Sequence, residues 1–239
     1  ASIIPIINFL LVFFYLPETK PKSNSNKLKT LLKNPLKQLL RVFEEEKIRK
    51  LSLAFFIYFI AFTGLTNILI FFLQESLGWT TKASSGTLVV VGIIAIIVQG
   101  GLIGPLVKQF GEMKLTLIGS GFILVACSLL ITAPKENATI NIYSAVSFLA
   151  VGAGLITPTL RALISKKLDI DKQGSILSNL QGLQSLGGVL GIAMAGRVYD
   201  SFGPKSPFIA GSIILIFMIY LIAEGKTNNS IFDQKTEVF

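Results

Sequence analysis

The chain has 239 residues, of which 51% are hydrophobic and 15% charged, with a formal net charge of +9 and a mean hydropathy of +0.68. An ordinary soluble domain of this size is far less apolar, so the composition predicts an integral membrane protein. With no histidine and one cysteine, the sequence excludes a disulfide framework, a Cys/His zinc site and a catalytic pair built on histidine.

The first apolar run covers residues 1–16 and ends before Pro17 and Glu18. A membrane-spanning helix needs about 20 apolar residues, so the run is short by about one turn. We expect residues 1–16 to be the end of a helix that begins further upstream.

The connector at residues 17–50 carries ten basic and four acidic residues. Such an excess of positive charge between apolar runs is typical of a cytoplasmic loop, and it gives no reason to expect a nucleic-acid partner. Between Leu28 and Phe43, leucines recur at helical spacing among lysines, which predicts an amphipathic helix. This helix would lie either on an anionic lipid leaflet or on the protein's own cytoplasmic face.

Six apolar runs then predict six membrane-spanning helices, because exposed backbone is excluded from lipid. They cover 51–73, 83–107, 115–133, 138–160, 173–196 and 206–223. The predicted fold class is an all-α membrane protein: a six-helix transmembrane bundle at 51–224, preceded by the end of another helix and followed by a tail at 225–239.

The distribution of basic residues predicts the orientation of the bundle. Eighteen of the 22 Lys and Arg residues fall on the side that holds the 17–50 connector and the tail. Because basic loops stay in the cytoplasm, we expect a multi-pass protein of the cell (inner) membrane with both segments on the cytoplasmic side.

The first of the six spans carries a polar stripe formed by Thr63, Asn67 and Gln74, at offsets of four and seven residues. These offsets place the three side chains on one helix face, among four phenylalanines. An aromatic wall with a few amides would line a cavity for a small molecule in the bilayer. Alternatively, the same groups make hydrogen bonds between helices.

The fifth span repeats this pattern with Gln181 and Gln184, which either line the same cavity or pack between helices. Glycines follow them at short intervals, from Gly187 to Gly196, and predict close helix packing. Arg161 ends the fourth span, and it would either extend to lipid phosphates or pair with an acid on a neighbouring helix.

Three stretches carry a family resemblance. Residues 104–114 read GPLVKQFGEMK, residues 16–19 read LPET, and residues 187–200 read GGVLGIAMAGRVYD. Their order resembles the second half of major facilitator transporters, particularly the drug/proton antiporter and tetracycline-efflux branch. The first stretch is similar to the loop between helices eight and nine of that family.

The resemblance implies helices seven to twelve of a twelve-helix transporter, whose missing amino-terminal six-helix half would be a partner. In that class two bundles rock about a site in mid-membrane. Gly104, Lys108, Gly111 and Arg161 would then belong to the cytoplasmic gate. Lys108 stands where the family's stronger motif has an acid, so a charge-paired latch through this loop is not expected.

Together these observations predict a secondary transporter that exports amphipathic, drug-like small molecules, with proton coupling left open. Its contacts would be the lipid bilayer and the substrate, which would meet Thr63, Asn67, Gln74, Gln181 and Gln184. The alternative is an incomplete six-helix membrane protein with a structural or assembly role. An enzyme is disfavoured because Asp169, Asp171 and Asp200 stand isolated in short loops, and no cofactor or metal site is expected.

Overall fold

The computed structural model describes the backbone of residues 39–134 and 138–236. The predicted helix end at 1–16 and most of the 17–50 connector lie outside the described residues. The last turns of the connector are described: a short 3-10 helix covers Arg41–Phe43. Val42 is fully buried, and Leu39 and Phe43 pack against the same hydrophobic core.

Each of the six predicted runs is helical in the described part of the chain, which contains no strand. Two of the helices contain one turn of π-helix, at Phe72–Ser76 and at Val98–Leu102. The α-helical segments are α4 (Glu46–Phe71), α5 (Thr81–Ile97), α6 (Ile103–Phe110), α7 (Glu112–Ile131), α8 (Thr139–Ser165), α9 (Ile170–Phe202) and α10 (Ser206–Thr236).

Five helices are long and apolar enough to cross a membrane by length and composition. These are Glu46–Ser76, Thr81–Phe110, Glu112–Ile131, Thr139–Ser165 and Ser206–Glu224. The sixth predicted span, α9, is a helix of 33 residues but falls below the same threshold. Glutamines, serines and glycines in its first half reduce its mean hydropathy, so α9 is the most polar of the long helices.

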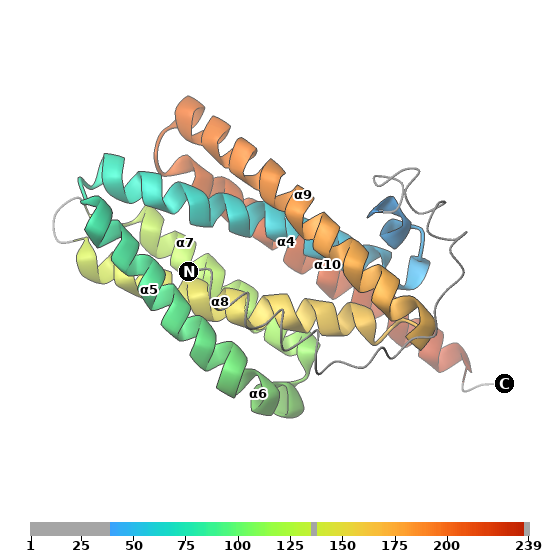
Figure 1. The fold of residues 1–239 in the computed structure, drawn as a ribbon. Coiled ribbons are helices and arrows are strands. Elements are labelled where there is room, and N and C mark those ends of the chain that lie inside the picture. The colour runs from blue at the N-terminus through green and yellow to red at the C-terminus, as the bar shows by residue number, and fades with distance from the viewer. Residues whose placement is uncertain (1–38, 135–137, 237–239) are drawn as a thin grey trace, which may run out of the picture. The chain divides into compact units, whose positions relative to one another are not determined.

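The long helices pack in two groups around an apolar core. Helices α9 and α10 pack on α4, whereas α5 and α7 pack on α8, and α10 also contacts α7. Figure 1 shows α9 and α10 beside α4. Aromatic rings fill the core, as where Phe72 of the first helix meets Phe208 of α10 edge to face at 5.2 Å.

Two contacts between helices rest on glycine pairs. Between α4 and α9, a Cβ atom on Gly64 would lie 2.8 Å from the carbonyl oxygen of Gly191, and one on Gly191 would overlap the carbonyl oxygen of Ile60. Between α7 and α8, a Cβ atom on Gly152 would lie 2.6 Å from the carbonyl oxygen of Gly119. The predicted role of glycine in close packing is confirmed at Gly191; Gly196 has open space where its side chain would be.

Helix α5 is the least covered of the five candidate spans. Only 11% of its apolar window is buried within the structure, against 39–50% for the others. Its outer face carries large apolar side chains that include Leu88, Val89, Ile93 and Ile96. This face is therefore suited to contact with lipid or with other membrane helices.

Candidate functional site

The clearest polar cluster joins α8 to α9 through Arg161. The Nη2 atom of Arg161 donates a hydrogen bond of 2.8 Å to Oε1 of Gln181 and a second, short one to Oε1 of Gln184. Gln181 and Gln184 share a face of α9 because they are three residues apart. The structure thus unites two predicted cavity residues with a residue predicted for the gate.

Helix α4 completes the surroundings of this cluster with aromatic rings. The guanidinium carbon of Arg161 lies 5.9 Å from the ring centroid of Phe55, within the range of a cation–π contact. The Tyr58 hydroxyl lies 3.3 Å from Oγ1 of Thr157, one turn before Arg161 on α8, and the Tyr58 ring stacks on Phe62. The cation is therefore held by amides on one helix and an aromatic ring on another.

The expected pairing of Arg161 with an acid is not seen among the described residues, and its extension to lipid phosphates stays a prediction. Its guanidinium points to neutral glutamines rather than to an acid, and the ion pairs found in the described part of the chain do not include it. The Nε atom is buried and has no hydrogen-bond partner. Arg161 is thus a half-buried cation with an unused donor.

The three residues of the predicted stripe differ in burial and in helix type. Thr63 is half-buried, and its side chain lies opposite Gly188 of α9, one turn beyond Gln184. Asn67 is exposed and donates through Nδ2 to the carbonyl oxygen of Thr63 at 2.9 Å. Gln74 is half-buried and falls in the π-helical turn Phe72–Ser76.

The loop between α6 and α7 turns at Gly111, which has φ = +76°. A side chain is strained at this positive φ, so the turn requires glycine. Gly104 and Lys108 are both exposed, and a Cβ atom on Gly104 would meet open space. No described neighbour therefore requires a glycine at position 104.

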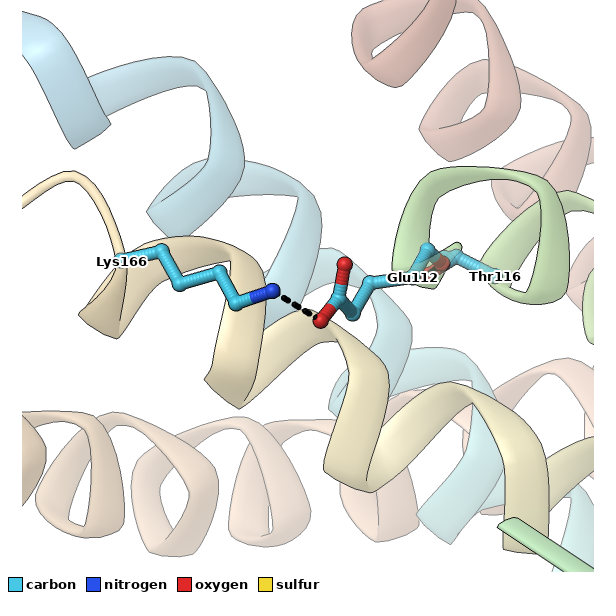
Figure 2. A network of polar contacts seen from close by, with 3 residues as sticks. All are labelled: Glu112, Thr116 and Lys166. Carbon is cyan, nitrogen blue, oxygen red and sulfur yellow. Dashed lines mark hydrogen bonds and ion pairs between the residues drawn. The ribbon is translucent and has the colours of Figure 1, made fainter. Parts of the chain in front are cut away.

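A charge pair does join this loop to α8, contrary to the expectation from Lys108. Glu112, the first residue of α7, accepts a hydrogen bond from Nζ of Lys166, which follows α8, as Figure 2 shows. The carbonyl oxygen of Glu112 also accepts from Oγ1 of Thr116. Glu112 follows the turn at Gly111, so the ion pair forms even though position 108 is a lysine and not an acid.

Two further ion pairs lie near the start of α4. Lys172 of α9 donates to Glu45 at 2.6 Å, and Lys50 donates to Glu224 of α10 at 2.8 Å. The hydrogen bond to Glu45 raises the pKa of Lys172. Burial lowers the pKa of Lys167 in the turn between α8 and α9. Several cations at this end of the bundle thus have acidic partners, in contrast to Arg161.

A separate open groove of about 420 Å³ runs along α7 and α8, away from Arg161. It is lined by Phe122, Tyr143, Ser144, Ser147, Phe148 and Val151. Its lining is mainly apolar, and Phe122 stacks on Phe148. None of these residues was predicted as a site residue, and nothing in the groove resembles the charged cluster at α8 and α9.

Sequence reasoning did not identify Phe55, Tyr58 and Thr157 as neighbours of Arg161. Phe55 and Tyr58 occur in a continuous apolar run and look like ordinary core residues. The sequence signal that could have been used is the spacing of Phe55 and Tyr58, because residues three positions apart lie on the same face of a helix.

The geometry defines a multi-pass helical membrane protein with a polar cluster between three of its helices. Residues 1–192 match the family model described as Major Facilitator Superfamily. The chain belongs to this superfamily, as its loop and glycine motifs predicted.

Individual relatives are distant. The chain is 20% identical to hippocampus abundant transcript-like protein 1 of Homo sapiens, over 93% of this chain and 48% of that protein. It is 24% identical to the class C tetracycline resistance protein of Escherichia coli, over 83% of the chain and 49% of the relative. It is 27% identical to the class H tetracycline resistance protein of Pasteurella multocida, over 56% of the chain and 32% of that protein. The chain thus spans about half the length of the first two relatives.

Proposed function

We propose that this chain is the carboxyl-terminal half of a secondary transporter that exports amphipathic, drug-like small molecules by alternating access. The observation that carries the proposal is the cluster of Arg161, Gln181 and Gln184. In this cluster a cation on α8 is hydrogen-bonded to neutral amides on α9. Polar groups that are only half buried between membrane helices are suited to binding a solute. Family membership favours a transporter over an enzyme.

In this proposal the bundle moves as one body against a second bundle. The glycine contacts at Gly64 and Gly191 hold α4 tightly to α9, so Phe55 on α4 and the glutamines on α9 would keep their relative positions while the two halves rock. The connector at 17–50 would link the halves, after a helix end at 1–16. Thr63 and Asn67 would extend the substrate path from the cluster along α4, and Gln74 would lie further out.

Gly104, Lys108, Gly111 and Arg161 are proposed to act at the cytoplasmic gate, together with the Glu112–Lys166 pair. The inner membrane is the proposed location, with the connector and the tail at 225–239 in the cytoplasm. Cysteines introduced at Lys114 and Lys205, both exposed, would test the orientation in intact cells. An impermeant thiol reagent should label position 205 and spare position 114, while the buried Cys127 should stay unlabelled; the reverse pattern would overturn the topology.

Transport itself is tested with the full-length protein as encoded, reconstituted in lipid vesicles. Tetracycline is a suitable first substrate because two relatives are named tetracycline resistance proteins. Uptake into inside-out vesicles should exceed that of protein-free vesicles and of the Arg161→Gln variant. If a protonophore abolishes uptake, the coupling ion is a proton; if uptake persists, proton coupling is refuted. No uptake of tetracycline or of a panel of amphipathic dyes would contradict the efflux proposal.

The second candidate is a six-helix membrane protein with a structural or assembly role and no transport of its own. The observation in its favour is that the chain spans about half of its relatives. Sequencing the messenger RNA decides between the two: an upstream reading frame with six more helices supports the transporter, and a stop codon before this segment supports the second candidate.

A further inference from the structure

Arg161 carries a charge that the described bundle does not neutralise. Lys50, Lys166 and Lys172 each have an acidic partner, whereas the acceptors of Arg161 are two uncharged amide oxygens. A guanidinium stays protonated in proteins, and a cation among membrane helices is costly without a counter-charge. The cluster therefore has an excess of positive charge.

The donors of Arg161 are also incompletely used. Both hydrogen bonds of the guanidinium start from Nη2, while the buried Nε has no partner. The Nε–H and one Nη2–H of a guanidinium point in the same direction and together bind two oxygens of a carboxylate. A buried donor without an acceptor is destabilising, so an incoming oxyanion that accepts from Nε would be favoured.

The glutamines occupy the place that such an oxyanion would take. An ionised acceptor binds a guanidinium about twice as strongly as a neutral amide oxygen does. Gln181 is exposed and Gln184 is half-buried, so both long side chains have room to turn aside. Once displaced, their amide NH₂ groups can donate to the same anion.

We infer that Arg161, Gln181 and Gln184 form a binding site for the carboxylate or phosphate group of a small molecule. Phe55 is fully buried and lies against the guanidinium from α4, so the ligand would enter on the side of the exposed Gln181. This inference rests on the proposed transport function for its biological meaning, and it narrows the substrate class from amphipathic molecules in general to amphipathic anions.

Binding to the purified full-length protein, measured by isothermal titration calorimetry in a neutral detergent, tests the inference without transport. Benzoate and benzamide are matched probes that differ in charge. Loss of a charged hydrogen bond costs about 1.5–3 kcal/mol, and each 1.4 kcal/mol is tenfold in affinity. Benzoate should therefore bind at least about tenfold more tightly than benzamide.

Three variants make the test specific. Arg161→Gln should weaken benzoate binding about tenfold or more. Arg197→Gln removes a positive charge from the exposed surface of α9 and should leave binding unchanged. Gln184→Glu supplies an internal carboxylate to Arg161, so it should abolish benzoate binding while raising the melting temperature. The third variant keeps the test informative if Arg161→Gln fails to fold.

Three results of these binding measurements would overturn the inference: equal affinity for benzoate and benzamide, equal loss of benzoate affinity in the Arg161 and Arg197 variants, or unchanged binding in Gln184→Glu.

A phospholipid phosphate is the other possible source of the anionic group. If added phosphatidylglycerol stabilises the wild type but not Arg161→Gln, while benzoate binds neither, the site holds lipid and the small-molecule assignment is wrong. Benzoate binding without vesicle transport would contradict the proposed function alone, and transport without benzoate binding would contradict this inference alone.

Discussion

The helix contacts made by α9 and the contact between α7 and α8 use the same packing device but differ in their polar groups. Each brings two backbones together at a glycine pair, Gly64 with Gly191 and Gly119 with Gly152. Small residues at such crossings allow the close approach that drives helix association in lipid. Tight packing alone therefore does not distinguish a structural contact from a functional one.

The polar groups make that distinction. Between α7 and α8, the hydroxyls of Thr116 and Thr159 are buried and lie 2.8 Å apart. Each hydroxyl has one proton: Thr116 donates to the carbonyl oxygen of Glu112, which leaves Thr159 to donate to Thr116. On α9, by contrast, Gln181 and Gln184 are held by a charged guanidinium that retains an unpaired donor. A closed set of hydrogen bonds stabilises the fold, whereas an incomplete one can accept a ligand.

The largest effect is expected from a substitution that disrupts a glycine pair, the feature that both contacts share. Gly191→Ala places a Cβ atom against the carbonyl oxygen of Ile60, so the backbones of α4 and α9 must separate. Overpacking of this kind costs about 1–3 kcal/mol, measured as a lower melting temperature in detergent. Gly196→Ala is the matched control, because nothing lies near its Cβ position. Equal losses in the two variants would contradict close packing at Gly191.

The next effect distinguishes the polar cluster between α8 and α9 from the closed contact between α7 and α8. Arg161→Gln should reduce the initial transport rate about tenfold, because it removes the charged donors proposed to meet the substrate. Its unfolding free energy should change little, since the guanidinium has no acidic partner to lose in the described bundle. Vesicle uptake and thermal unfolding are measured on the same preparation. A stability loss with unchanged transport per folded molecule would assign Arg161 a structural role.

A smaller effect is expected in the closed hydrogen-bond set. Thr159→Val keeps the shape of the side chain but removes the bond to Thr116, and it should lower stability by about 0.6 kcal/mol, a typical value for such bonds between membrane helices. Transport should be unaffected. A transport defect in this variant would show that the α7–α8 contact also takes part in function.

The smallest effect concerns the charge pair beside the glycine turn. Lys166 is 67% exposed in its pair with Glu112, and exposed ion pairs contribute about 0–1 kcal/mol. Lys166→Gln should therefore leave the melting temperature nearly unchanged at physiological salt. If the pair contributes to gating, this variant changes the transport rate, and the exchanged pair Glu112→Lys with Lys166→Glu should restore it. Failure of the exchange to restore the rate would argue against gating by this pair.

The sequence predicted the helices because the requirement for about 20 apolar residues is local and can be counted along the chain. It predicted that Gln181 and Gln184 share a face for the same reason. It did not predict that Arg161 meets them, since that contact depends on how α8 packs against α9. The Glu112–Lys166 pair was missed similarly, as its partners are 54 residues apart. The π-helical turn that contains Gln74 was also not predicted, because the sequence pattern was read with regular α-helical spacing.

The comparison between Gln184→Leu and Thr159→Val tests the central claim most directly. Both variants remove one polar partner at a contact between two helices, and both would be measured as transport rate per folded protein in the same vesicles. We predict that Gln184→Leu transports several-fold more slowly than the wild type, while Thr159→Val transports at the wild-type rate. Equal rates in the two variants would contradict the assignment of substrate binding to the cluster around Arg161.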